Sequence, residues 1–478
     1  MDYEPVIGLE VHAELQTHSK MFCSCEVVDL TRSAPNIAVC PICAGMPGTL
    51  PVVNRMAVEY AVRVALALGC TVNHTSIFAR KNYFYPDLPK GYQITQYEHP
   101  LAEHGELSIL TPQGERTIGV RRVHLEEDTG KLTHVDGASL VDLNRAGVPL
   151  LEIVSEPDMH SVEEAKLYAE GLRDVLRYLD VNSGDMEKGV IRFEANVSLR
   201  PRGATELGKR VEIKNLNSFR ALERAATFEL KRQANVLSGG GAVEQETLGW
   251  DDVNERTYSQ RSKEEAHDYR YFPEPDLPPL VVEEDWIAGV RKSLPELPRA
   301  KAERLARQYG LNAYTTGRLV ERREVADYFE RAAATGAASA AGIANWILGE
   351  LFAMMRQSQS ESGELRPPAQ ELAALVGMVE RGEINQMTGK QVLADMYASG
   401  RRAAEIVEAG ALRQVSDTGL IKRIVAEALS ENPKEVASFK SGKAGVANFL
   451  FGQAMKKAAG KANPQLVKAE LEKQLSTV

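Results

Sequence analysis

The chain lacks long apolar segments. A membrane-spanning helix needs about 18 consecutive apolar residues, and no such run occurs in the 478 residues. The first residues, MDYEPVIGLEVH, also lack the basic and apolar regions of a secretory signal peptide. These absences argue against membrane insertion and against secretion, so we expect a cytoplasmic protein with no membrane partner.

The sequence also lacks the short motifs of several large enzyme classes. It contains no G-x-x-x-x-G-K-[ST], no G-x-G-x-x-G, no G-x-S-x-G and no H-E-x-x-H. A P-loop, a dinucleotide-binding fold, a nucleophile elbow and a zinc-protease helix therefore have no support. If the protein uses ATP, we expect the nucleotide to bind on a sheet.

Cysteine is scarce, with five residues in the chain, and four of them form two close pairs. Cys23 and Cys25 are spaced C-x-C, and Cys40 and Cys43 are spaced C-x-x-C. We expect the first pair on one side of an extended strand and the second pair in a turn that starts at Pro41. In a reducing compartment such pairs are metal ligands or redox groups more often than disulfides.

Four thiolates at this spacing suit tetrahedral Zn²⁺, and a complete set of four leaves no coordination position for substrate or water. The sequence therefore favours a structural zinc site. The alternative is a redox function for Cys40 and Cys43, which would place a single C-x-x-C at a strand-to-helix junction. Cys70 stands alone in an apolar segment and is expected to pack in the core.

The first 290 or so residues consist of short alternating segments broken by Gly, Pro and Asn, which predicts an antiparallel sheet with helices, an α+β domain. Strands are predicted at residues 6–15, 191–200 and 210–214, and helices at 161–179 and from 218 to 238–241. Ser161 and Glu164 stand in capping-box register at the start of the first helix.

Helical spacing dominates from about residue 295, after a proline-rich boundary at 271–280. We predict three domains: an α+β domain at 1–292, an all-α domain at 293–410 with a polar loop at 357–368, and a small helical tail at 411–478. The tail holds 11 Lys or Arg against 6 Asp or Glu in a chain of net charge -9. It could contact a polyanion, or it could be an ordinary solvated surface.

Acidic residues, histidines and one asparagine share faces of the predicted strands. They are Glu10 with His12, then His124, Glu126 and Asp128, and then Glu194 with Asn196. An imidazole among several carboxylates on one sheet face is what hard divalent cations and phosphoryl transfer need. One such strand alone is typical of the solvated face of an antiparallel sheet, but several together favour a functional site.

Aromatic and basic residues gather in the segment ARKNYFYPDLPKGYQITQ at 79–96. Its rings and cations are Tyr83, Phe84 and Tyr85 beside Arg80, Lys81 and Lys90. This mixture could hold an adenine ring and phosphates, or it could cap the edge of a core.

Long segments of the chain match one known family. They are VIGLEVHAEL, KMFCSC, CPICAGMPGTLPVVN, RKNYFYPDLPKGYQITQ, HLEEDTGK, DLNRAGVPLLEIVSEPDM, VEIKNLNSFR, EEAHDYRYFPEPDLPPL, ANWILGELF and GQAMKKAAGKANP. In this order they closely resemble the B subunit of the bacterial aspartyl/glutamyl-tRNA amidotransferase, over nearly the whole chain. Long contiguous segments in one order are more specific than any of the spacings above.

The resemblance implies a three-subunit enzyme that converts Glu-tRNA(Gln) to Gln-tRNA(Gln) and Asp-tRNA(Asn) to Asn-tRNA(Asn). The B subunit would bind the tRNA and use ATP and Mg²⁺ to phosphorylate the side-chain carboxylate, which ammonia then amidates. An amidase-type A subunit would supply the ammonia from glutamine, and a small C subunit would brace the other two. The first domain would resemble glutamine synthetase and the guanido kinases.

The resemblance also implies roles for individual residues. Catalytic roles fall on Glu10, His12, Glu126, Glu212 and Lys214; ATP or substrate contacts on Lys81, Tyr83, Tyr85, Glu194, Asn196, Asn215 and Asn217; Mg²⁺ on Glu10, His12 and Glu126; and Zn²⁺ on Cys23, Cys25, Cys40 and Cys43. One departure stands out: the family usually carries Cys and Asp where this chain has Phe193 and Glu194. The longer Glu194 keeps the charge but changes the geometry of the site.

Two other functions remain open at this stage. The chain could be a non-catalytic subunit that binds tRNA and assembles the complex, with its Glu and His face merely solvated. It could also be a zinc-dependent hydrolase that uses Glu10 and His12. The sequence does not decide whether Glu-tRNA, Asp-tRNA or both are the substrates.

Overall fold

The computed structural model describes residues 3–261, 268–357, 365–414, 418–441, 443, 445–458 and 462–477. The chain forms two compact units that divide between Leu297 and Pro298. None of the described helices is long and apolar enough to cross a membrane.

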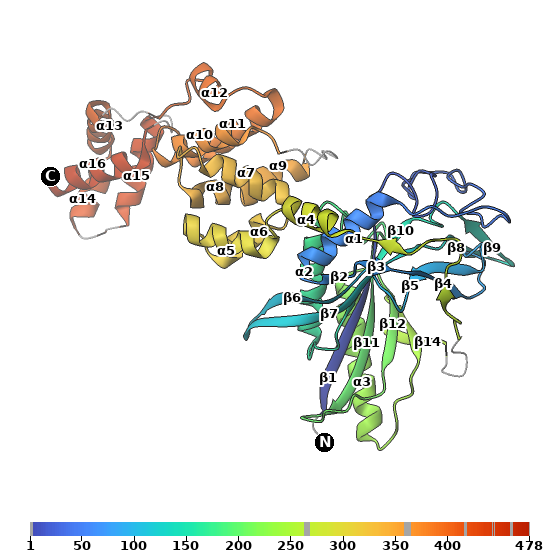
Figure 1. Ribbon diagram of the computed structural model, residues 1–478. Coiled ribbons are helices and arrows are strands. Elements are labelled where there is room, and N and C mark those ends of the chain that lie inside the picture. The colour runs from blue at the N-terminus through green and yellow to red at the C-terminus, as the bar shows by residue number, and fades with distance from the viewer. Residues whose placement is uncertain are drawn as a thin grey trace. The chain divides into compact units, whose positions relative to one another are not determined.

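The first unit is built around a nine-stranded sheet (Figure 1), in the order β14-β13-β12-β11-β1-β10-β7-β6-β2. The strands are β1 (Tyr3–Glu14), β2 (Thr71–Val72), β6 (Ala102–Thr111), β7 (Gly114–Glu127), β10 (Pro149–Ser155), β11 (Ile191–Pro201), β12 (Val211–Leu216), β13 (Thr247–Asp251) and β14 (Arg256–Arg261). Neighbours are antiparallel except β12 and β13, which are parallel. The central strand β1 therefore pairs with two strands that lie far from it in the sequence.

Smaller sheets complete this unit. A three-stranded sheet has the order β15-β4-β5, and the pairs β16-β3 and β8-β9 are two-stranded. Their bounds are β3 (Thr75–Ser76), β4 (Phe78–Asn82), β5 (Tyr92–Gln96), β8 (Lys131–Val135), β9 (Ala138–Asp142), β15 (Phe272–Pro273) and β16 (Leu280–Val281). The strand β5 joins this part to the large sheet, because Gln96 accepts a hydrogen bond from Leu125 N of β7 at 3.0 Å.

Helices cover one face of the large sheet. They are α1 (Arg55–Ala67), α2 (Val162–Tyr178) and α3 (Phe219–Ser238), and α4 (Glu284–Ser293) packs against α1. Side chains alternate along a strand, so Leu9, Val11 and Ala13 are buried in the core beneath these helices. Glu10 and His12 consequently lie on the opposite face, which carries few apolar side chains.

The structure confirms the predicted strands and helices of this unit, with ends shifted by a few residues. Ser161 caps α2 by accepting a hydrogen bond from Glu164 N at 3.1 Å. The reciprocal half of the capping box differs, because the Glu164 carboxylate accepts from His160 N at 2.6 Å. Cys70 is buried in the core, as predicted.

The described part of the second unit is helical. Its elements are α5 (Pro298–Tyr309), α6 (Ala313–Leu319), α7 (Arg323–Ala333), α8 (Ala340–Trp346), the π-helical turn η2 (Ile347–Leu351), α9 (Phe352–Gln357), α10 (Ala369–Glu380), α11 (Gln386–Ser399), α12 (Ala403–Ala409), α13 (Thr418–Glu431), α14 (Pro433–Lys440), α15 (Val446–Lys457) and α16 (Pro464–Thr477). A separate core that includes Ile421, Val425 and Leu450 joins helices of the tail.

The α+β class is confirmed in its main features, with a sheet-rich first unit and a helical second one. The division at 292/293 and 410/411 into three domains stays a prediction. Most of the predicted polar loop at 357–368 lies outside the described residues.

Candidate functional site

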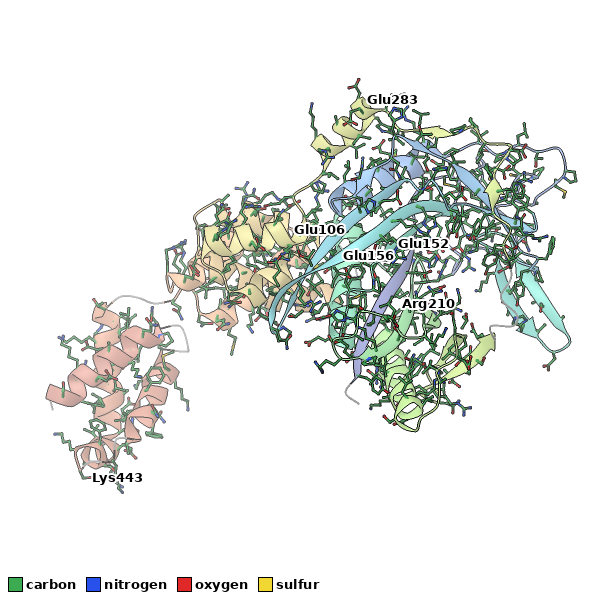
Figure 2. The ribbon with its side chains drawn as sticks, turned by 60° about the horizontal axis from the view of Figure 1, so that its bottom comes forward. Glu106, Glu152, Glu156, Arg210, Glu283 and Lys443 are labelled. Carbon is green, nitrogen blue, oxygen red and sulfur yellow. The ribbon has the colours of Figure 1, made fainter. Side chains whose placement is uncertain are left out.

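A cavity of about 930 Å³ lies over the polar face of the large sheet. Its walls include Glu10, His12, Lys81, Tyr83, Tyr85, Asp128, Arg145, Glu152, Arg192, Glu194, Arg210, Glu212, Lys214, Asn215, Tyr269 and Tyr271. Glu152 on β10 and Arg210 just before β12, both labelled in Figure 2, are among these lining residues. The lining is mostly ionisable or aromatic, and its volume suits a nucleotide-sized ligand.

A first acidic cluster lies where β1, β10 and β7 run side by side. The ring Nε2 of His12 is 3.4 Å from Glu152 and 3.8 Å from Glu126. His124 Nε2 also lies close to the Glu152 carboxylate, at 3.3 Å. One ligand atom each from His12, Glu126 and Glu152 fall within 4.8 Å of one another. The separations of 3.4 and 3.8 Å lie within the span of about 4.2 Å between opposite oxygens on one Mg²⁺.

The charged groups of this first cluster shift one another's pKa values. Burial alone disfavours a charged His12, but its hydrogen bond to Glu152 and the surrounding carboxylates raise its pKa to about 9. Burial and the charge of Glu152 raise the pKa of Glu126. The pKa of Glu152 is lowered despite burial, because His124 and His12 lie against it. A buried group of this kind needs a proton or a metal cation to balance its charge.

A second acidic cluster lies where β1, β11 and β12 meet. Glu10 is directly opposite Glu194 in the antiparallel register, and Glu212 joins them within 4.8 Å. Lys214 Nζ balances part of this charge, 2.8 Å from Glu194 and 3.3 Å from Glu212. Burial and the charges of Glu152 and Glu194 still raise the pKa of Glu10. Like charges directly opposite each other destabilise a sheet, so this arrangement favours bound cations.

The three asparagines predicted to contact substrate lie in different places. Asn196 Nδ2 donates to Glu10 at 2.9 Å, while its buried Oδ1 has no hydrogen-bond partner among the described residues. Asn215 lines the cavity and has a left-handed backbone with φ 59. Asn217 is exposed beyond the end of β12 and is not among the residues that line this cavity.

Lys81 reaches the cavity from β4, beside a wall of tyrosines. Its Nζ lies 5.0 Å from the ring centre of Tyr269 and 5.9 Å from that of Tyr83. It makes no ion pair with a described residue. Burial opposes its charge, but Glu126 and other nearby acidic groups raise its pKa. Lys81 is therefore a charged donor available to an anionic ligand.

The other two basic residues of segment 79–96 serve the structure of the domain. Arg80 forms a bidentate pair with the buried Glu274, at 2.7 Å from both nitrogens, and Lys90 pairs with the buried Glu127. Neither belongs to the cavity lining. Tyr85 does line the cavity, while Phe84 is 82% exposed.

Arginines line another side of the cavity. Arg192 Nη2 donates to Asp128 at 2.8 Å, and Arg145 Nε lies 3.7 Å from the same carboxylate. Burial works against the charge of Asp128, yet these two guanidinium groups lower its pKa to about 2. This wall is thus fixed by charge pairing.

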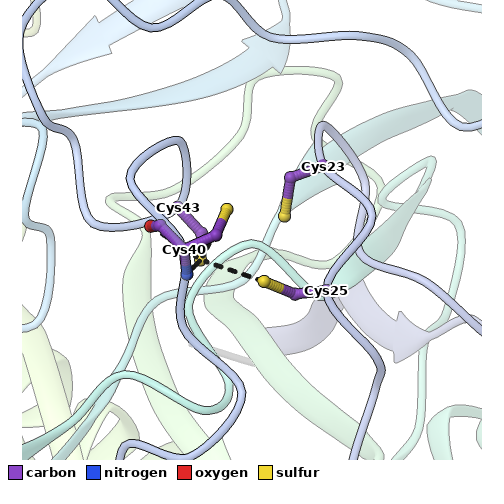
Figure 3. Close-up of side chains that lie close together, drawn as sticks. All are labelled: Cys23, Cys25, Cys40 and Cys43. Carbon is purple, nitrogen blue, oxygen red and sulfur yellow. Dashed lines mark hydrogen bonds between the residues drawn. The ribbon is translucent and has the colours of Figure 1, made fainter.

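The four paired cysteines of the first unit converge (Figure 3), and we call them the cysteine cluster. The prediction of an extended strand at Cys23 and Cys25 was wrong, because both lie in irregular backbone that curves towards the second pair. The predicted turn at Pro41 is present, with Ala44 N bonded to Cys40 O at 2.9 Å. The loop conformation is set by its long-range contacts, which the local spacing does not record.

The sulfur geometry of the cysteine cluster fits Zn²⁺. Sγ of Cys43 is 3.9 Å from that of Cys25 and 3.8 Å from that of Cys40. Bond lengths of about 2.3 Å in a ZnS₄ tetrahedron give sulfur separations of about 3.8 Å. Hydrogen bonding from Cys23 outweighs burial and, with the nearby Lys20, lowers the pKa of Cys43 to about 4. The cluster is therefore compatible with a structural zinc ion.

Glu152 and the tyrosines 269 and 271 are cavity residues that the sequence reasoning missed. Glu152 is a single acid within the otherwise apolar strand PLLEIVS. That pattern is a usable signal, since a lone carboxylate in an apolar strand has to be paired or to bind a cation. The two tyrosines belong to DYRYF, whose place beside β4 depends on the tertiary structure.

Comparison with known proteins finds two family models on this chain. The GatB/GatE catalytic domain matches residues 5–288, and the GatB domain matches residues 327–475. The chain is 51% identical over 476 residues to the B subunit of the aspartyl/glutamyl-tRNA(Asn/Gln) amidotransferase of Myxococcus xanthus, covering 99% of each chain. It is 51% identical to the same subunit of Moorella thermoacetica and 47% identical to that of Persephonella marina, covering 99% of this chain and 100% of each relative.

Proposed function

This chain belongs to the family of B subunits of aspartyl/glutamyl-tRNA(Asn/Gln) amidotransferases, and from that premise we propose that it activates misacylated tRNA for amidation. The substrate would be Glu-tRNA(Gln), Asp-tRNA(Asn) or both. The side-chain carboxylate attacks the γ-phosphorus of ATP, and ADP leaves. Ammonia then attacks the carbonyl carbon of the acyl phosphate and loses a proton, and inorganic phosphate leaves.

The observation that carries this proposal is the pair of acidic clusters on one face of one sheet. His12, Glu126 and Glu152 form one cluster, and Glu10, Glu194 and Glu212 form the other. Mg²⁺ is usually held by one or two carboxylates together with substrate phosphates, so two clusters in one cavity suit metal-assisted phosphoryl transfer. When bound, the metal ions would neutralise the charge that develops on the phosphates.

The chain's own residues would orient and neutralise the reacting groups. Lys81, with no ion pair among described residues, would contact the transferred phosphate. Lys214 would hold Glu194 and Glu212 in place, as it does at 2.8 and 3.3 Å. The tyrosine wall and the Arg192–Asp128 pair would limit the access of water to the acyl phosphate, which water would otherwise hydrolyse.

Membership of the family also suggests the fold, the metal and the partners of this chain. We propose that the sheet-rich unit shares the fold of glutamine synthetase and the guanido kinases, that zinc in the cysteine cluster is structural, and that the tail contacts tRNA. Ammonia would come from an amidase-type A subunit that hydrolyses glutamine, with a small C subunit completing a cytoplasmic heterotrimer.

The test is the formation of ADP by the purified complex with Glu-tRNA(Gln), glutamine and ATP. We expect ADP formation to require both the aminoacyl-tRNA and Mg²⁺, and to be lost in Glu10→Gln and His12→Ala while the variant chain stays folded and in the complex. Near-normal turnover in either variant would remove that residue from the site.

The other two functions predict different results in the same assay. A chain that only binds tRNA and assembles the complex would leave ADP formation unchanged in both variants. A zinc-dependent hydrolase would need no ATP and would lose activity on removal of zinc. Two observations argue against the hydrolase function. Glu10 and His12 belong to separate clusters, and four thiolates leave no coordination position on zinc for water or substrate.

A further inference from the structure

Lys20 is a fully buried lysine, with 0% of its surface exposed, three residues before the first cysteine. Its Nζ donates to Ala38 O at 2.8 Å and to Leu143 O at 3.2 Å. The third contact of the ammonium is Cys43 Sγ, at 3.7 Å. An ammonium has three N–H donors, so each has an acceptor, and one acceptor is a sulfur of the cysteine cluster.

Among the residues that the structure describes, no carboxylate balances the charge of Lys20. Within the described ranges, none of the acidic side chains forms an ion pair with this lysine. Two carbonyl oxygens satisfy hydrogen bonds but carry no net charge, and an unbalanced buried ammonium destabilises the folded state. The anionic group that touches it is the cysteine cluster, which would carry a net charge of about -2 as four thiolates on Zn²⁺.

We propose that Lys20 is the counter-charge of the zinc site. Its ammonium donates to the Cys43 sulfur and offsets the excess negative charge of the four thiolates, which tightens the binding of zinc. It acts as a positioning residue, because it would touch a ligand and not the metal. This inference rests on the proposed zinc in the cysteine cluster and adds a residue that no feature of the C-x-C and C-x-x-C spacing indicates.

The contacts of Lys20 also connect the cysteine cluster to the wall of the cavity. Ala38 precedes the second cysteine pair, whereas Leu143 begins the loop that carries Arg145. In the same loop lies Gly147, at φ 86, where an added Cβ would be in ordinary van der Waals contact with both Lys20 and Cys43, at 3.5 Å. Gly147 O also accepts from Met21 N at 2.7 Å. One ammonium therefore holds together the cluster and a loop of the cavity.

The experiment compares Lys20→Met with Lys188→Met in the purified full chain. Methionine keeps the length and apolar stem of lysine and removes the charge. Lys188 is the matched control, because it pairs with Asp29 between the two cysteine pairs at 2.9 Å but is 44% exposed and is not in contact with sulfur. The first measurement is zinc content, and the second is the rate at which zinc passes to a chromophoric chelator.

We expect Lys20→Met to release zinc about 10- to 100-fold faster than the wild type, the usual effect of losing a partner of a metal ligand. Lys188→Met should match the wild type. With Co²⁺ in place of zinc, the sulfur-to-metal charge-transfer band of Lys20→Met should move to longer wavelength, because removing a nearby positive charge raises the energy of the sulfur electrons. If Lys20 only filled space, Lys20→Met would change neither the rate of zinc release nor the position of the cobalt band.

Unchanged zinc release and an unchanged cobalt band in Lys20→Met would overturn the proposal, even if the variant melts earlier. An equal effect of Lys188→Met would overturn it too. If Lys20→Met does not fold, Lys20→Gln, which keeps an N–H donor but no charge, takes its place with the same two criteria. A wild-type chain without zinc would instead refute the zinc site, and with it the premise of this inference.

Discussion

Opposed carboxylates define the site at the scale of single residues. Glu10 faces Glu194 across β1 and β11, and Glu152 lies between two histidines. A soluble protein rarely buries such groups unless a charge of opposite sign joins them. Lys214 and His12 supply part of it, and bound divalent cations would supply the rest.

Glu152 gives the sharpest test of the first acidic cluster. Glu152→Gln keeps the shape of the side chain but removes the charge that both histidines contact, so we expect ADP formation to fall by about 100-fold or more. Glu156→Gln is the matched control, since Glu156 lies one residue beyond the same strand and pairs with the exposed Arg121 instead. If Glu152→Gln kept the full rate of ADP formation and needed no more Mg²⁺ than the wild type, the result would contradict a metal role for this cluster.

Cys40→Ser tests whether the cysteine cluster supports the structure or the chemistry. We expect loss of zinc and a thermal midpoint lower by several degrees, because a structural zinc site contributes folding free energy. Below that midpoint, ADP formation should largely persist. Zinc content by mass spectrometry and a melting curve measure the first two effects. A stable variant that is selectively inactive would place the cluster in the active site.

At the scale of elements, β11 shows how one strand serves the core and the site together. Phe193 points to the helices, is fully buried and packs against Phe219 of α3 at 5.6 Å between ring centres. Glu194, the next residue, points to the cavity and accepts a hydrogen bond from Lys214 Nζ. The two positions at which the resemblance implies a departure from the family thus lie on opposite faces of the sheet, so one affects the core and the other the cavity.

Phe193→Ala should destabilise the first unit by about 3–5 kcal/mol, the usual cost of a cavity left by a buried phenylalanine. Denaturant unfolding measures this change. Phe84→Ala is the control, because that ring is 82% exposed and should cost less than about 0.5 kcal/mol. Equal costs in the two variants would show that Phe193 does not support the contact between α3 and the sheet.

At the scale of the whole molecule, each unit has its own buried core. The core of the first unit extends to Leu294 and Leu297, which pack against it beyond the end of α4. The tail has a second core with no residue in common. Such independence is typical of parts that fold as separate units.

We therefore expect a chain that ends at Leu297 to fold cooperatively and to retain zinc. A chain that ends at residue 292 removes the last residue of α4 and both leucines, and should be less stable by roughly 1–3 kcal/mol from lost apolar burial. Thermal unfolding of the two proteins, with zinc content as a check of the cysteine cluster, measures the difference. Equal stability would show that residues 293–297 add nothing to the first unit.

Much of the fold could be predicted from local patterns. The alternation in IRFEANVSLR predicts β11, and Ser161 predicts the start of α2, because strand period and helix capping are properties of neighbouring residues. The predicted path of Cys23 and Cys25 was wrong for the opposite reason. The backbone that leads into Cys23 is held at Met21 by contacts with Asn54 and Gly147, such as Asn54 N to Met21 O at 2.9 Å, which no local pattern encodes.

The sequence by itself determined the family, the alternating faces of the strands and the donor set of four cysteines, since each depends on residue order alone. The tertiary structure decided which faces meet. It separated Glu10 and His12 into two clusters, added Glu152 to one of them, and turned Arg80 and Lys90 away from the cavity. It also brought Lys20 to the cysteine cluster, because strand pairing and loop packing join residues that lie more than a hundred positions apart.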